Sequence, residues 1–294
     1  MFVLHNNTLS GIQKLMADNK GGFYLFSGDK GLGKCTAAKL LAARLLNAGE
    51  TNLMAHPDFF IMSSQDDVIK VDDLDELKRF VSFVPANAGI KVSIIDDADS
   101  MTETAQNSLL KLLEDGTQSN LIILIAHHPV LETIRSRSMQ VDFLPLNEKE
   151  MNQAFDGKGM DPQLIRFSCG HPGMVYRLTD SPIGEELKKI VNSVSSMKQT
   201  RELLEIFSIL KEKDKNSFFD THTSEEVVVL LDVLSDLFFK AVNGQDYLSN
   251  LYGQQDLFCI LQKISIAKNQ IRRKGQFGKN DFLISSVPWW LCNK

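Results

Sequence analysis

Hydrophobic residues between positions 22 and 143 fall into short runs that alternate with amphipathic stretches. This alternation is typical of a parallel α/β sheet with crossover helices. It predicts strands at Phe23–Ser27, Phe59–Met62, Lys91–Ile95, Leu121–Ala126 and Met139–Phe143. It also predicts helices at Lys34–Leu46, Asp72–Val84 and Thr102–Glu114. The second helix should carry one apolar face of Leu74, Leu77, Phe80, Val81 and Val84, and a capping box of Ser100 and Glu103 should open the third.

The pattern changes after Pro145, where strand signals end and helical ones remain. Residues 147–178 are expected to hold two or three short helices, with Pro162 in a first turn and a break at residues 169–173. Longer amphipathic stretches follow, among them Glu225–Val242 and Leu257–Ile271. We therefore expect an α/β domain over residues 1–146, a small helical domain over 147–183 and a third, all-helical domain over 184–294.

Composition narrows the class of protein. The chain has 294 residues, of which 43% are hydrophobic and 23% charged, so it can bury the cores of two or three domains. A net charge of -5 argues against coating of nucleic acid by bulk electrostatics, so any DNA contact must be local. No apolar run approaches the ~20 residues that span a bilayer, and no secretory signal is visible, so we expect a cytoplasmic protein without membrane contact.

The cysteines give no sign of a metal ribbon or a disulfide framework. They form no CxxC pair and stand far apart, at Cys35, Cys169, Cys259 and Cys292. We expect reduced thiols.

A glycine-rich loop lies between the first predicted strand and the first predicted helix. It matches seven positions of a phosphate-binding loop: Gly28, Asp29, Lys30, Gly31, Leu32, Gly33 and Lys34. Such glycines let backbone N–H groups point at phosphate oxygens, and the lysine and the helix N-terminus add positive potential. The alternative is a turn that merely joins a strand to a helix.

The eighth position of this loop is Cys35, where the pattern has a serine or threonine that ligates Mg²⁺. A thiol is a poor ligand for that hard cation. Thr36 follows, but it lies ~100° further around the helix and should not reach the same ion. Nucleotide binding is therefore better supported than hydrolysis.

Two carboxylates end the third predicted strand. Asp96 is positioned to hold a metal ion or its water shell at the carboxyl edge of the sheet, with Asp97 beside it. The alternative is that both carboxylates cap the next helix, together with Asp99 and Ser100.

The stretch Ile94–Thr102, continued by Ala105, Asn107 and Leu109–Glu114, resembles a block of bacterial clamp-loader subunits of the AAA+ superfamily. His56-Pro57-Asp58, Ile134–Ser138 and the turn Gly170–Gly173 are similar to further motifs of that family. The resemblance covers residues 20–145 by motif and the remainder by architecture. It implies an AAA+ P-loop domain, a small helical lid and an all-α collar that mediates oligomerisation.

The resemblance also implies roles for single residues. Arg137 would be an arginine finger that reaches the ATP of a neighbouring subunit. Asp97 stands where the family usually has the glutamate that activates water. His127 would be a nucleotide sensor, at a position where threonine or asparagine is commoner. The implied ligands are ATP or ADP with Mg²⁺ held through Asp96.

Departures from the family pattern refine the prediction. The zinc-binding cysteines of many clamp-loader subunits are missing between Asn47 and Phe59, so zinc is not expected. Ser138 replaces a cysteine beside Arg137, and Met174 stands where motor subunits tend to have a basic residue. The change at Met174 favours the delta-prime type, with weak or absent hydrolysis of its own, whereas Ser138 need not affect the arginine.

Such a subunit would assist ATP-dependent loading of the sliding clamp onto primed DNA in replication, as part of the DNA polymerase III holoenzyme. Its partners would be motor subunits of gamma/tau type, a delta-type subunit and, through the complex, the clamp and DNA. Two alternatives stay open: an active gamma/tau-like AAA+ ATPase and a P-loop kinase of small molecules.

Several residues have plainer interpretations. Arg137 could be an ordinary surface arginine. His127 and His128 could suggest a metal, but no cysteine or carboxylate joins them at ligand spacing along the chain. A basic cluster near a helix end either contacts DNA or is a solvated helix face; it consists of Lys268, Arg272, Arg273, Lys274 and Lys279. The pair Trp289 and Trp290 anchors either the last domain or a subunit interface.

Overall fold

A computed structural model of the chain describes residues 4–18, 21–64, 68–114, 119–180, 184–185, 187–189, 231, 233–235 and 264–265. They belong to two compact units, one within residues 1–158 and 170–173 and the other within 159–169 and 174–294. The basic cluster, the tryptophan pair and nearly all of the helices predicted after residue 190 lie outside the described residues.

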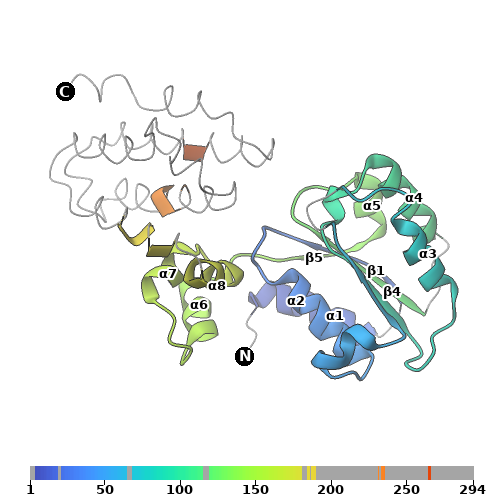
Figure 1. Ribbon diagram of the computed structural model, residues 1–294, viewed down its shortest axis with the longest axis horizontal. Helices are drawn as coiled ribbons and strands as arrows, with labels where there is room; N and C mark the ends of the chain where they lie inside the picture. Colours follow the sequence, from blue (N-terminus) through green and yellow to red (C-terminus); the bar gives the residue numbers. More distant parts are fainter. Residues whose placement is uncertain are drawn as a thin grey trace, which may run out of the picture. The chain divides into compact units, whose positions relative to one another are not determined.

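A five-stranded sheet forms the centre of the first unit (Figure 1). All strand pairs are parallel and the order is β2-β3-β4-β1-β5. The strands are β1 Gly22–Ser27, β2 Phe59–Met62, β3 Lys91–Ile95, β4 Asn120–Ala126 and β5 Met139–Asp142. Each predicted strand is therefore confirmed to within one residue at its ends.

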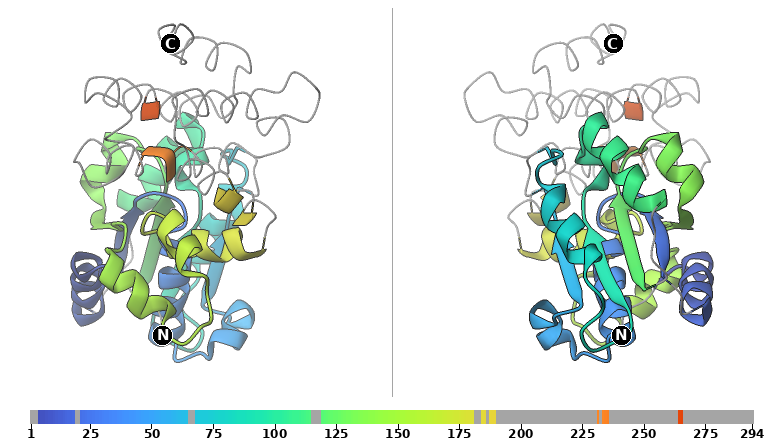
Figure 2. Two further views of the ribbon diagram at one scale, coloured as in Figure 1. Left: turned by 90° about the vertical axis from the view of Figure 1, so that its left-hand side faces the viewer. Right: turned by 90° about the vertical axis from the view of Figure 1, so that its right-hand side faces the viewer.

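Helices cover both faces of this sheet (Figure 2). The elements of the α/β part are α1 Asn6–Asp18, α2 Lys34–Leu45, η1 Glu50–Ala55, α3 Leu74–Ser82, η2 Ala98–Ser100, α4 Glu103–Glu114 and α5 Glu132–Arg137. Alternate residues of β4 face opposite ways: Ile123 joins the core beneath α1 and α2, whereas Ile122 and Leu124 join the core beneath α3, α4 and α5. The α/β fold expected from the pattern is confirmed.

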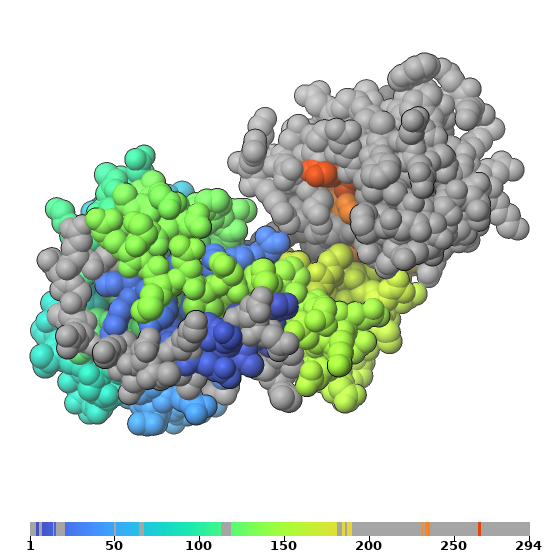
Figure 3. Space-filling view, turned by 180° about the vertical axis from the view of Figure 1, so that it is seen from behind, coloured from blue at the N-terminus to red at the C-terminus, as the bar shows by residue number. Residues whose placement is uncertain are grey.

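Helix α1 was not predicted from the pattern. It lies along the edge strand β5 and is visible at the surface in the darkest blue (Figure 3). The Thr8 hydroxyl donates to the carbonyl of Asp142 at 2.7 Å, and a Cβ at Gly11 would lie 3.2 Å from Val141. The helix therefore packs closely on β5, and among its side chains that the structure describes Ile12 and Leu15 are buried and apolar.

Helix α3 is shorter than predicted. It buries Leu74 and Leu77 completely, as expected, but it ends at Ser82 and Phe83 is already extended. Val84 is 85% exposed and is not part of the buried face, so its assignment was wrong. Because Val84 precedes Pro85, its backbone is disfavoured in the helical region, and the helix stops before it.

The start of α4 also differs from the prediction. The Thr102 hydroxyl accepts the N–H of Ala105 at 3.1 Å and so caps the helix. Ser100 instead belongs to η2, and its buried hydroxyl has no hydrogen-bond partner among the described residues. The Ser100–Glu103 capping box is therefore wrong, because η2 ends before the helix begins.

Three short helices follow the sheet, as expected: α6 Glu148–Phe155, α7 Pro162–Phe167 and α8 Pro172–Asp180. Asn147 and Glu150 form a capping box on α6. Pro162 is in the first turn of α7, as expected, and the carboxylate of Asp161 accepts the N–H of Gln163 there. None of the helices in the described part of the chain is long and apolar enough to cross a bilayer.

Candidate nucleotide site

The glycine-rich loop joins β1 to α2, and its glycines are required by its backbone. Gly31 and Gly33 have φ of 87° and 82°, in the left-handed region that side chains rarely adopt. Gly28 has φ of 139°, and a Cβ there would run into the carbonyl of Phe143. Leu32 is buried in the core beneath α2. The loop thus has the tight backbone that a phosphate-binding loop needs.

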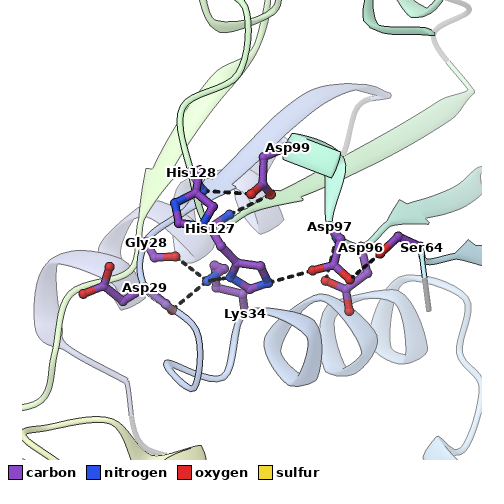
Figure 4. Close-up of polar contacts among 9 residues, drawn as sticks. All are labelled: Gly28, Asp29, Lys34, Ser64, Asp96, Asp97, Asp99, His127 and His128. Atoms are coloured by element: carbon purple, nitrogen blue, oxygen red, sulfur yellow. Dashed lines mark hydrogen bonds and ion pairs between the residues drawn. The ribbon is translucent and has the colours of Figure 1, made fainter. Parts of the chain in front are cut away.

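Lys34 opens α2 and turns back toward this loop (Figure 4). Its ammonium donates to the carbonyls of Gly28 and Asp29, the latter at 2.7 Å, and lies 2.8 Å from Nδ1 of His127. The residue is only 3% exposed. Burial lowers the pKa of Lys34 to about 8, although the carboxylates of Asp29 and Asp96 act in the opposite direction.

Asp96 and Asp97 follow β3, as predicted, at the carboxyl edge of the sheet. One oxygen of Asp97 accepts from the Ser64 hydroxyl at 3.1 Å, and the other lies 3.1 Å from Nε2 of His127. The hydrogen bond from His127 lowers the pKa of Asp97, and Ser64 adds to this effect, so that together they outweigh the opposing effect of burial. Neither side chain caps η2, which leaves the capping alternative without support.

Asp99 has a different function from the helix capping considered for it. Its two carboxylate oxygens accept the backbone N–H groups of His127 and His128 at 2.9 and 3.1 Å. This carboxylate fixes the turn after β4 beside the end of β3 (Figure 4). The His127 ring is thereby placed between Lys34 and Asp97.

Cys35 lies within reach of Asp96. Burial raises the pKa of the Cys35 thiol to about 12, and the hydrogen bond that the thiol donates to Asp96 adds to this shift. The thiol therefore stays protonated near neutral pH and is unsuited to a hard cation. Thr36, the next residue, is exposed.

Asp96, Asp97 and His127 bring one ligand atom each to within 4.8 Å of one another. Asp96 and Asp97 therefore join His127 in space, although no carboxylate stands beside it at ligand spacing along the chain. The carboxylate oxygens suit Mg²⁺, whereas the thiol that stands where the loop normally supplies a hydroxyl does not. The donor set thus fits Mg²⁺ through Asp96 but lacks one ordinary ligand.

The turn at residues 170–173 contacts the glycine-rich loop. The N–H of Gly173 donates to the carbonyl of Gly31 at 2.9 Å, and Nε2 of His171 lies 3.7 Å from the Asp29 carboxylate. We did not single out His171 from the sequence, and no local signal marks it. Met174 belongs to the second unit and is described only as part of α8.

Arg137 is the last residue of α5, a helix that the pattern did not predict. Its side chain is exposed, and its guanidinium donates to the carbonyl of Thr133 at 3.3 Å. Ser138, the residue after it, donates its hydroxyl to the carbonyl of Ile134. Arg137 is thus presented at a helix end on the surface of its unit.

The His56-Pro57-Asp58 motif is structural in this chain. Asp58 is fully buried, and its carboxylate accepts the N–H groups of Ala86, Asn87 and Ala88. Burial raises the pKa of Asp58, but these three donors more than offset it, so the pKa lies below its usual value. The motif therefore fixes the loop before β3.

A parallel sheet with a glycine-rich loop after β1 and a pair of carboxylates after β3 defines a P-loop NTPase domain of the AAA+ class. A solved protein with this fold is the DNA polymerase III gamma subunit-related protein of Thermotoga maritima, with a TM-score of 0.53 and 19% identity over 98% of each chain. That likeness supports the fold.

Residues 5–147 match the family described as "DNA polymerase III, delta subunit". The chain is 25% identical to DNA polymerase III subunit delta' of Bacillus subtilis over 274 residues, which are 84% of this chain and 79% of the relative. It is 29% identical to the subunit of the same name in Pseudomonas aeruginosa over 199 residues, 59% of this chain and 60% of the relative. Over the matched residues the chain is similar to delta-prime-type clamp-loader subunits, in agreement with the resemblance drawn from its motifs.

Proposed function

We propose that this chain is a clamp-loader subunit that assists ATP-dependent loading of a sliding clamp onto primed DNA, and that Arg137 acts as an arginine finger in trans. The exposed position of Arg137 at the end of α5 carries this proposal. A guanidinium exposed at a helix end lies on the surface that a neighbouring subunit can contact. There it can stabilise the charge that develops on a transferred phosphoryl group.

The chain's own loop binds ATP or ADP in this proposal. The nucleotide contacts come from the loop residues 28–34, Cys35, Thr36 and Asp96, with Mg²⁺ held through Asp96. Hydrolysis by this site is weak or absent because Cys35 offers no hydroxyl and Asp97 is one methylene shorter than glutamate. Partners are motor subunits of gamma/tau type and a delta-type subunit, and through them the clamp and DNA.

The test is a reconstituted clamp loader that contains the Arg137→Ala chain. An arginine finger contributes about 10³ to 10⁵ in rate at the site it completes, so that site should become nearly inactive. Total ATP turnover should fall in part, and clamp loading should fall further. Complexes with wild-type and variant chains are compared at equal assembly, by phosphate release and by loading of labelled clamp.

Arg135→Ala is the matched control. Arg135 lies on the same helix and is also exposed; its guanidinium lies 3.7 Å from the carboxylate of Glu132 and donates to the side chain of Gln140. Its loss should leave turnover and loading near the wild-type level. Equal values for the Arg137→Ala and wild-type complexes would show that Arg137 is an ordinary surface residue.

A further inference from the structure

We propose that His127 competes with nucleotide phosphate for Lys34, so that the contact between them restrains the chain's own loop. We call the connection from Lys34 through the His127 ring to Asp97 the His127 bridge (Figure 4). The inference rests on the proposed binding of nucleotide to this loop, and it concerns how that binding is regulated.

The ammonium of Lys34 has no spare donor. It carries three N–H groups, and the structure gives it three acceptors: the carbonyls of Gly28 and Asp29 and Nδ1 of His127. With the residue 3% exposed, a phosphate oxygen can reach the ammonium only by displacing one of these acceptors. Two of them belong to the loop itself, and the third is a ring nitrogen of His127, at the end of β4.

This geometry determines the tautomer of His127. A charged lysine can only donate, so Nδ1 accepts and the proton of the neutral ring lies on Nε2, which faces Asp97 at 3.1 Å. Asp97 is held in turn by Ser64, and Asp99 fixes the backbone of His127. The ring is therefore held from three sides in the position where it occupies Lys34.

The N–H group of Lys34 that donates to His127 cannot at the same time donate to a phosphate oxygen. A phosphate dianion is the stronger acceptor, but it must first break a hydrogen bond to a charged group that is already formed. Nucleotide affinity is lowered by the free energy needed to break the hydrogen bond between Lys34 and His127. If His127 were a nucleotide sensor, its removal would weaken nucleotide binding or the response to bound nucleotide. Competition for Lys34 predicts instead that its removal strengthens nucleotide binding.

The experiment compares ATP affinity of the full chain and three variants by titration calorimetry. His127→Ala removes the acceptor and should lower the Kd on the order of tenfold, the low end of what a hydrogen bond to a charged group contributes. His127→Asn keeps an oxygen that can accept from Lys34 and should stay near wild type. His128→Ala is the control, because the exposed His128 uses only its backbone N–H in the site.

A second measurement examines the bridge without nucleotide. The ¹⁵N shifts of the His127 ring should show a proton on Nε2 and none on Nδ1, and the Nδ1 signal should move when ATP is added. A proton on Nδ1 in the ligand-free chain would overturn the bridge. ATP binding with equal Kd in wild type and His127→Ala would show that His127 does not compete with phosphate for Lys34, and it would leave the hydrogen bonds of the bridge unaffected. Absence of ATP binding in all four chains would contradict nucleotide binding by this loop, and the regulation with it.

Discussion

Cys35 differs from the hydroxyl residue of an ordinary phosphate-binding loop in both its chemistry and its partner. Its thiol has a pKa raised to about 12, by burial first and then by the hydrogen bond to Asp96. The thiol therefore donates to the carboxylate that would hold Mg²⁺. Asp97 is likewise occupied, by His127 and Ser64. Compared with an ordinary active site, Cys35 thus lacks the hydroxyl and Asp97 lacks one methylene.

The double variant Cys35→Ser/Asp97→Glu should gain ATPase activity. Serine restores the hydroxyl that ligates Mg²⁺, and glutamate restores the methylene that places a carboxylate on the attacking water. We expect negligible steady-state hydrolysis by the wild-type chain and a measurable rate for the double variant. The measurement is phosphate release by the purified chain in excess ATP and Mg²⁺.

Each single variant serves as a control, because one missing group should still limit the rate. Robust hydrolysis by the unmodified chain would contradict the prediction and would favour an active gamma/tau-like ATPase. A double variant that binds ATP without hydrolysing it would place a further defect elsewhere in the site.

At the level of elements, the short helix η2 changes how α4 begins. The pattern of a serine followed three residues later by glutamate predicted a capping box at Ser100. In the structure the chain makes a 3-10 turn at residues 98–100, and the helix starts after Thr102. The cap is therefore displaced by two residues.

Thr102→Ala should destabilise the chain and Ser100→Ala should not. Loss of a threonine cap costs about 1 kcal/mol of unfolding free energy. Ser100 loses only a buried hydroxyl without a partner among the described residues, a change that is close to neutral. Chemical denaturation of both variants, followed by circular dichroism, measures the difference. A larger loss from Ser100→Ala than from Thr102→Ala would contradict the capping by Thr102.

At the scale of the whole molecule, the three-domain organisation stays a proposal. Among the residues that the structure describes, those in both cores of the α/β part lie before position 144. The contacts of Lys188 with Asp161 and Glu185 occur before residue 190. A chain without residues 190–294 thus keeps every hydrogen bond and ion pair described above.

Deleting residues 190–294 should abolish assembly and leave a folded N-terminal part. We propose that residues 184–294 form a helical collar that supplies most contacts to other subunits. The truncated chain should show a cooperative thermal transition but should no longer co-elute with its partners in gel filtration. The full chain under the same conditions is the control, and co-elution of the truncated chain would exclude the collar as the main site of assembly.

The sequence by itself determined the strands and the glycine-rich loop. Strand β4 is buried along its whole length, so Leu121–Ala126 is a continuous apolar run that can be recognised without knowing its neighbours. The glycines of the loop are required by its local backbone, and Gly31 and Gly33 therefore identify it directly. Such features depend on residues that are adjacent in the chain.

Only the tertiary structure decided how the site residues contact one another. Lys34 and His127 are 93 positions apart and meet because β1 and β4 are adjacent in the sheet. The parallel order brings the ends of β1, β3 and β4 to one edge, where Asp99 fixes His127 against Lys34. A side chain's partner in such a site depends on strand order and on turn geometry, and neither is encoded in the spacing of residues along the chain.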